Sequence, residues 1–439
     1  MIAVMLAVLT AAPGVSARTL DNGAEIVALT RPSVEVATFR IAMRAGNLHD
    51  PAGKSGLARV SALTLFEHIQ RAAPDLAMRL RLECGPTSTA LVGYGDPSRL
   101  VIDVERILET ALSARVAPKT FIEARDRALS ERRRLPVDPL ALAFAGAHRM
   151  LASRLGPSWV GGTREGIGSL ESDDVKAWLQ KHVTGSSLVV GIASPRARED
   201  LEGLSVITSI LRAGRRPTLA APARPKTTGR RVLIVDRPGS REVVALVAQA
   251  GAAATRPDLG PLTAGLAAFS SSFTAVTSSA SRRAHVTPIH LPLSVGHTVV
   301  DGTYAVALRT STATLASGLT AVLSAFEDAA RDGLDEAQAR RGARRAALEL
   351  SARLDHAEGR LAALVATRLL SVPVDAPFDR RDAAAAADRE AINSALAGFL
   401  DPEHLVIVVV ADTTPTLSRT IAKVPGIGGV EVLTYDALF

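Results

Sequence analysis

Two stretches of the sequence, far apart in the chain, share one pattern. Residues 23–46 read GAEIVALTRPSVEVATFRIAMRAG, and residues 229–251 read GRRVLIVDRPGSREVVALVAQAG. Each runs through a short apolar segment, an Arg-Pro pair, a second apolar segment and a final Ala-Gly. Because proline fixes φ and removes a backbone donor, the Arg-Pro pairs mark turns. Each copy is therefore predicted to form a β-hairpin or a strand–turn–strand unit.

A second pair of matching segments lies late in each half of the chain. Residues 187–192 (SLVVGI) and 404–409 (HLVIVV) each predict a buried strand. A match at two distant points indicates two similar domains of about 200 residues each. The stretch 213–230 is rich in Pro, Ala and Arg and predicts a linker, so the expected domains cover 18–212 and 231–439.

Long segments rich in Ala, Leu and Arg alternate with the predicted strands. The segments predicted to be helical are 54–70, 97–113, 119–134, 138–153, 172–182, 256–270, 312–331, 335–353, 355–370 and 382–398. Strands and helices mixed in each half predict an α+β fold of two similar domains. In each domain, a mostly antiparallel β-sheet is expected to be layered with α-helices.

The composition excludes several classes of protein. The chain has 439 residues, of which 47% are hydrophobic and 22% charged, so it is neither disordered nor collagen-like. Its single Cys excludes an intramolecular disulfide framework and a Cys-based metal site. The net charge of +7 leaves a basic nucleic-acid-binding protein as a remote alternative. Aromatic residues, which would stack on bases, make up only 3%, so we expect no nucleic-acid partner.

The N-terminus predicts export. Residues 2–15 are almost wholly apolar, and Val15-Ser16-Ala17 is a small-x-small cleavage pattern. Residues 1–17 are therefore interpreted as a signal peptide, and the mature chain is expected in the periplasm. No later apolar run is long enough for a membrane span, so no transmembrane segment is expected in the mature chain.

Short passages along the whole chain carry a family resemblance. They are residues 20–23 (LDNG), 44–46 (RAG), 50–58 (DPAGKSGLA), 161–167 (GGTREGI), 400–412 (LDPEHLVIVVVAD) and 430–433 (VEVL). In these passages the sequence resembles the insulinase/pitrilysin family of zinc metallopeptidases. The similarity is greatest to the two-domain bacterial and mitochondrial-processing-peptidase-like members. The resemblance implies the two-domain repeat that the sequence itself indicates.

The resemblance also implies a zinc site, and this chain departs from it. The family carries an inverted motif, H-x-x-E-H, on the helix after the equivalent of residues 56–58, with a later Glu as third ligand. Here Arg59 and Leu63 replace the two His ligands, and Ala62 replaces the catalytic Glu. Only Glu131, at the third-ligand position, is retained. We therefore expect no catalytic residue and no zinc, and we expect Arg59 to pair with Glu131.

Two further sets of residues remain as candidates. Glu67 and His68 fit the end of the motif in a register shifted by five residues, and with Glu131 they define a possible non-standard zinc site. Arg282 falls near the Arg with which the family positions peptide substrates. The Tyr that accompanies it in the family would fall at about Ile289, so that pair is broken.

These observations favour a non-catalytic member of the family, a pseudopeptidase that is not an enzyme on its own. The resemblance implies a hetero-oligomer with an active zinc-bearing homologue that handles short or unfolded peptides. The alternative is an active zinc metalloendopeptidase that uses Glu67, His68 and Glu131.

Overall fold

The computed structural model describes residues 14–113, 116–134, 138–151, 161–218, 229–253, 255–280, 285–290 and 303–438. The chain divides into two units, each of which takes most of one half of the sequence and a short piece of the other. Unit 1 comprises Met1–Arg132, Ser158–Leu219 and Ala352–Phe378, and unit 2 comprises Arg133–Pro157, Ala220–Ser351 and Asp379–Phe439. The expected ranges 18–212 and 231–439 do not include this exchange of segments.

The sheet of unit 1 has six strands in the order β1-β2-β6-β3-β5-β4. Their bounds are β1 Val15–Thr19, β2 Glu25–Thr30, β3 Ala37–Met43, β4 Leu80–Cys84, β5 Thr89–Gly95 and β6 Leu188–Ser194. β2 and β6 run parallel, and the other neighbouring pairs are antiparallel.

The sheet of unit 2 has the order β12-β7-β11-β8-β10-β9. Its strands are β7 Arg230–Asp236, β8 Val243–Ala250, β9 His285–His290, β10 Thr303–Thr310, β11 Val406–Ala411 and β12 Ile427–Thr434. β7 runs parallel to both β11 and β12, and the remaining pairs are antiparallel. β7 begins at Arg230, the last residue of the predicted linker 213–230.

The sequence repeat forms the middle of each sheet. β2 and β3 come from the first copy, β7 and β8 from the second, and the predicted late strands are β6 and β11. In each sheet the late strand lies between the two strands of the repeat. The strand–turn–strand prediction is therefore confirmed and the hairpin alternative is wrong. β6 and β11 are buried along their whole length, so a strand formed late in each half completes the centre of the sheet.

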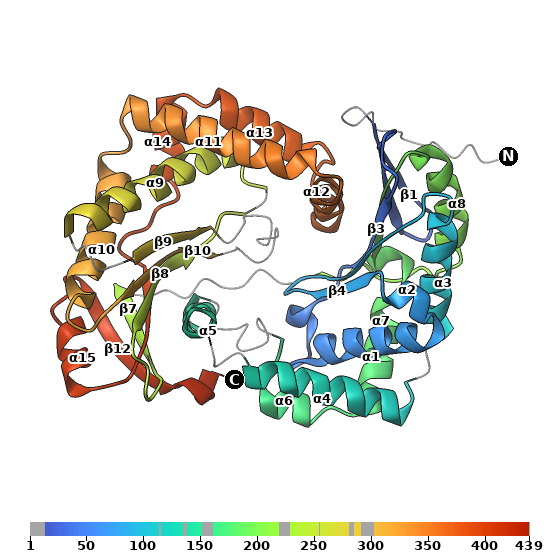
Figure 1. Ribbon diagram of the computed structural model, residues 1–439, viewed down its shortest axis with the longest axis horizontal. Helices are drawn as coiled ribbons and strands as arrows, with labels where there is room; N and C mark the ends of the chain where they lie inside the picture. The colour runs from blue at the N-terminus through green and yellow to red at the C-terminus, as the bar shows by residue number, and fades with distance from the viewer. Residues whose placement is uncertain are drawn as a thin grey trace. The chain divides into compact units, whose positions relative to one another are not determined.

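Helices fill the rest of both units (Figure 1). Those mainly of unit 1 are α1 Leu57–Ala72, α2 Pro74–Ala77, α3 Leu100–Ser113, α4 Pro118–Arg134, α6 Arg164–Gly168, α7 Ser172–His182, α8 Ala197–Ser209 and α12 Ala357–Leu370. Those mainly of unit 2 are α5 Pro139–Leu151, α9 Leu259–Ala280, α10 Leu315–Arg331, α11 Glu336–Asp355, α13 Ala376–Ala386, α14 Arg389–Ala397 and α15 Pro415–Ile421. The mixed sheets with layered helices confirm the α+β class.

One predicted helix is divided in the structure. The stretch 382–398 contains the end of α13 and the whole of α14. Asp388 caps α14, because its side chain accepts a hydrogen bond of 2.8 Å from the Ala391 amide. A helix cap of this kind stops one helix and starts the next without interrupting the apolar pattern.

Each sheet carries on one face a helix from the other half of the sequence. α12 packs on β2, β3 and β6 of unit 1, and α5 packs on β7, β8 and β11 of unit 2. Glycine in the sheet or the helix allows this close approach. A Cβ at Gly191 of β6 would lie 2.3 Å from Val365 of α12, and one at Gly146 of α5 would lie 2.8 Å from Val408 of β11. The opposite face of each sheet packs on the helices of its own half.

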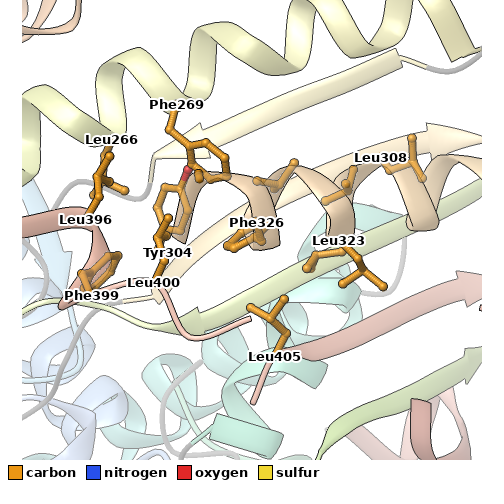
Figure 2. Close-up of a cluster of buried hydrophobic side chains, with 14 of the residues drawn as sticks. Leu266, Phe269, Tyr304, Leu308, Leu323, Phe326, Leu396, Phe399, Leu400 and Leu405 are labelled. Carbon is orange, nitrogen blue, oxygen red and sulfur yellow. The ribbon is translucent and has the colours of Figure 1, made fainter. Parts of the chain in front are cut away.

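The main core of unit 2 contains a cluster of aromatic side chains (Figure 2). Phe269 of α9 meets Phe326 of α10 edge to face, with ring centroids 5.1 Å apart. Tyr304 of β10 lies 6.0 Å from both Phe326 and Phe399. Edge-to-face aromatic pairs add to the stabilisation from burial, so this cluster ties the helices to the sheet. None of the described helices is long and apolar enough to cross a membrane.

Candidate functional site

The first turn of α1 is positioned by the half-buried carboxylate of Asp50. Gly56, with φ of 98°, precedes the helix, and Asp50 accepts hydrogen bonds of 2.7 Å from the amides of Gly56 and Ala58. These amides have no carbonyl partner within the helix, and the helix dipole favours an anion there. Burial raises the pKa of Asp50 to about 7, against the opposing effect of the amides. The turn that carries residue 59 is therefore fixed at its start.

Two of the positions that the resemblance assigns to zinc chemistry lie inside the core. Leu63 is fully buried, and Ala62 is 1% exposed. Neither side chain has a lone pair to offer a metal ion, and Ala62 has no group that could move a proton. Leu63 belongs to the hydrophobic core that α1 forms with the sheet of unit 1.

Arg59 and Glu131 bind each other directly. α4 lies beside α1 (Figure 1), and Nε and Nη2 of Arg59 donate to the Glu131 carboxylate at 3.0 Å to Oε2, 2.8 Å to Oε1 and 2.7 Å to Oε2. A fork of this kind is the strongest arrangement of a guanidinium and a carboxylate. The expected pairing of Arg59 with Glu131 is confirmed.

The alternative zinc residues belong to the same ionic network. Nη1 of Arg127 lies 3.0 Å from Oε1 of Glu67, and Nε of Arg127 lies 3.6 Å from Oε1 of Glu131. The guanidinium of Arg127 thus lies against both carboxylates that the alternative site would need. His68, the next residue after Glu67, is half-buried. The resulting order of charges is Glu67, Arg127, Glu131 and Arg59, with alternating sign.

The residues at these positions do not fit a zinc ion. Zinc takes deprotonated sulfur, imidazole nitrogen or carboxylate oxygen, and it is repelled by guanidinium groups. Arg59 and Arg127 both contact the carboxylate oxygens of Glu131, the residue at which the resemblance places the third ligand. Within the described ranges, no group of three or more His, Cys, Asp or Glu side chains lies close enough to hold a metal.

Arg127 is the site residue that the sequence analysis missed. Arg127 precedes Glu131 by four residues on α4, and this i,i+4 spacing is the signal that could have found it.

Cys84 ends β4, and its Sγ lies 3.5 Å from Oδ1 of Asn47 and 3.6 Å from Oγ1 of Thr89. Burial raises the pKa of the Cys84 thiol, so it remains protonated at neutral pH.

The peptide-positioning candidate, Arg282, lies outside the described residues. Ile289 falls in β9, the edge strand of the unit 2 sheet, where it is opposite Ala305 of β10.

No family model matches the sequence, and no curated protein matches it either. Solved structures do match. A peptidase M16 inactive domain from Pseudomonas fluorescens has a TM-score of 0.78 at 16% identity, over 91% of this chain and 98% of that one. A protease from Helicobacter pylori has a TM-score of 0.75 at 14% identity, over 91% of this chain and 100% of that one. The periplasmic protease PqqL from Escherichia coli has a TM-score of 0.73 at 11% identity, over 95% of this chain and 50% of that one.

These likenesses cover nearly the whole chain at low sequence identity, so they establish its fold. Together with the two similar α+β units, they identify the chain as a protein with the fold of the M16 peptidases, the insulinase/pitrilysin type.

Proposed function

We propose that this chain is a non-catalytic member of the insulinase/pitrilysin family and the partner subunit of an active zinc peptidase. The single observation that carries the proposal is the two-point contact between Arg59 and Glu131. It places a guanidinium where the family resemblance expects a metal ion. The frame of two units is kept while the groups that hold zinc and activate water are replaced.

One structural neighbour supports this proposal. The Pseudomonas fluorescens structure is described as an inactive domain of a peptidase M16, and it matches 91% of this chain. A non-catalytic subunit with this fold would still contribute surface to a chamber in which a homologue cleaves short or unfolded peptides.

The alternative, a zinc endopeptidase that uses Glu67, His68 and Glu131, is less well supported. Arg127 contacts both carboxylates, and releasing them for a metal would leave its charge, and that of Arg59, without their present partners. Two uncompensated cations beside a dication are electrostatically unfavourable.

Export to the periplasm is part of the proposal, and PqqL, which has the same fold, is described as periplasmic. The cleavage point needs adjustment, however. Val15, Ser16 and Ala17 are three of the five residues of β1, and Val15 is 7% exposed. Cleavage after Ala17 would remove most of that strand, so a processed chain is expected to begin before Val15. Mass spectrometry of the protein purified from the periplasm measures this directly.

The test of the partner role is a reconstitution. The purified chain is assayed for hydrolysis of a mixed library of short unfolded peptides, alone and with a co-encoded homologue that has an intact H-x-x-E-H motif. We expect no hydrolysis by the chain alone, and at least a tenfold higher rate from the mixture than from the homologue alone, a gain of about 1.4 kcal/mol.

A matched control separates catalysis by each subunit. Replacing the motif Glu of the homologue by Gln should abolish activity of the mixture, because the present chain supplies no base. Hydrolysis that persists in that mixture, or that the chain performs alone, would overturn the proposal. A homologue that neither binds the chain nor gains activity from it would overturn the partner role.

A further inference from the structure

A cluster of arginines around one buried carboxylate lies in unit 1, away from the zinc positions. Glu25 begins β2 and is 5% exposed. Its carboxylate accepts hydrogen bonds from Arg44 and Arg368, and Nη2 of Arg216 lies 3.5 Å from its Oε1. Three guanidinium groups thus share one carboxylate. In the described part of the chain, these arginines form no ion pair with any other acid.

The positive charge of the cluster is only partly compensated. Two backbone carbonyls accept from it: Ser186 O at 3.1 Å from Arg44, and Arg368 O at 2.8 Å from Arg44 and 3.3 Å from Arg216. Carbonyls offer partial charges, so a formal excess of two positive charges remains. Arg44 is 5% exposed, and within the described ranges its Nε has no hydrogen-bond partner. An uncompensated buried charge is costly, and a further anion would lower that cost.

The outer side of the cluster offers donors to solvent. The Arg216 side chain is 43% exposed and that of Arg368 20%, whereas Glu25 and Arg44 lie beneath them. Two exposed residues with hydroxyl groups are already engaged there. Oγ of Ser371 accepts from Arg216 at 2.6 Å, and Oγ1 of Thr19 accepts from Arg368 at 3.3 Å. We call this outer side the rim. It consists of the guanidinium groups of Arg216 and Arg368 and the hydroxyl groups of Ser371 and Thr19.

The backbone conformation of Ser371 is a second, independent feature of this cluster. Ser371 caps the C-terminus of α12 with φ of 63°, and it is the one non-glycine residue with positive φ in the described part of the chain. Glycine is the usual residue at such a position. A serine held there carries backbone strain, and its hydroxyl accepts a hydrogen bond from Arg216.

We propose that this rim binds an oxyanion, a phosphate or carboxylate group, between Arg216 and Arg368 with the hydroxyls of Thr19 and Ser371. Guanidinium groups match the geometry of both oxyanions through paired N–H donors. The anion neutralises the charge that Glu25 leaves uncompensated. It also joins β1, the segment that contains Arg216 and the end of α12, three parts of unit 1 that are distant in sequence.

The test is the melting temperature of the full chain in sodium phosphate, sodium acetate and, at equal ionic strength, sodium chloride. We expect phosphate or acetate to raise it by about 2–4 °C in a saturable way, beyond the chloride control. Which of the two oxyanions saturates at lower concentration identifies the preferred group.

The variant Arg216→Gln should lose this shift, and the matched variant Arg215→Gln should keep it, since Arg215 is an exposed neighbour with no contact to Glu25. Ser371→Gly should raise the stability of the ion-free protein and weaken the apparent affinity roughly fivefold, because one donor is lost. An equal shift in Arg216→Gln, or a shift no larger than that in chloride, would overturn the proposal. An unchanged affinity in Ser371→Gly would contradict the placement of the anion.

Discussion

The Arg59 guanidinium and the Glu131 carboxylate are joined by contacts of 2.7–3.0 Å from two nitrogens, and this pair links α1 to α4. Each charge therefore compensates the other at the contact between the two helices. The Arg59 side chain is 21% exposed and that of Glu131 38%, so the pair is partly screened by water.

The pair should stabilise the protein measurably. A double-mutant cycle with Arg59→Met and Glu131→Gln should give a coupling of about 1 kcal/mol, because the contact is bidentate and partly buried. Urea unfolding of the four proteins measures it. The exposed pair Arg331 and Asp328 is the control and should give less than about 0.5 kcal/mol. Equal couplings in the two cycles would contradict this assignment.

His68 should be dispensable. The variant His68→Ala should leave the zinc content of the protein unchanged. It should also leave the free energy of unfolding within about 0.5 kcal/mol of the wild type, because His68 is half-buried and lies outside the ionic network. Metal analysis and thermal unfolding provide the measurement. Loss of bound zinc in this variant would instead support the alternative peptidase.

Stability should fall in acid because of a buried histidine. His182 is 2% exposed, packs on Trp178 with ring centroids 4.8 Å apart, and lies 5.7 Å from the ring of His49. Burial, with smaller contributions from the charges of His49 and Lys181, lowers the pKa of His182 to about 4. The unfolded chain titrates near 6.5, so below that pH it binds a proton that the folded chain does not. The free energy of unfolding should therefore decrease as the pH falls from about 6.5 to about 4.

The variant His182→Phe isolates this effect. Between pH 7 and pH 4, the free energy of unfolding of this variant should fall by about 2 kcal/mol less than that of the wild type. Urea unfolding at each pH measures the difference. Asp50 acts in the opposite direction, since its pKa of about 7 in the folded state exceeds the ordinary value and its contribution is lost as the pH rises. Because Asp50 is present in both the variant and the wild type, its contribution to the pH dependence cancels when the two are compared. The exposed His356 supplies the control, His356→Gln, and an equal effect there would refute the assignment.

The helix α12 should be needed for the stability of unit 1. Leu364 is fully buried against the sheet, so Leu364→Ala should cost about 2–4 kcal/mol. Hydrogen exchange should accelerate first in β2, β3 and β6, which α12 covers. Leu348→Ala, at a site that is 61% exposed, should change stability by less than about 0.5 kcal/mol. Faster exchange confined to unit 2 would contradict this account.

The local pattern of the sequence predicted most helices and the central strands, because these depend on apolar periodicity within one segment. It did not predict which sheet α5 and α12 cover. The amphipathic pattern of a helix shows which of its faces is buried but does not identify the surface on which that face packs. The insertion of β6 between β2 and β3 was missed for the same reason, because strand order depends on contacts far along the chain.

The candidate site was predictable only in part. The pairing of Arg59 with Glu131 followed from opposite charges at positions that the family resemblance brings together. The cluster at Glu25 was not foreseen, because Arg44, Arg216 and Arg368 are separated by more than 150 residues and meet only through the fold.

The central claim is that the ionic pair of Arg59 and Glu131 takes the place of a metal. Equilibrium dialysis of the purified chain against zinc, followed by elemental analysis, tests it most directly. The account predicts far less than one zinc ion per chain, with no change in Glu131→Gln. One tightly bound zinc ion per chain that is lost in Glu131→Gln would contradict it.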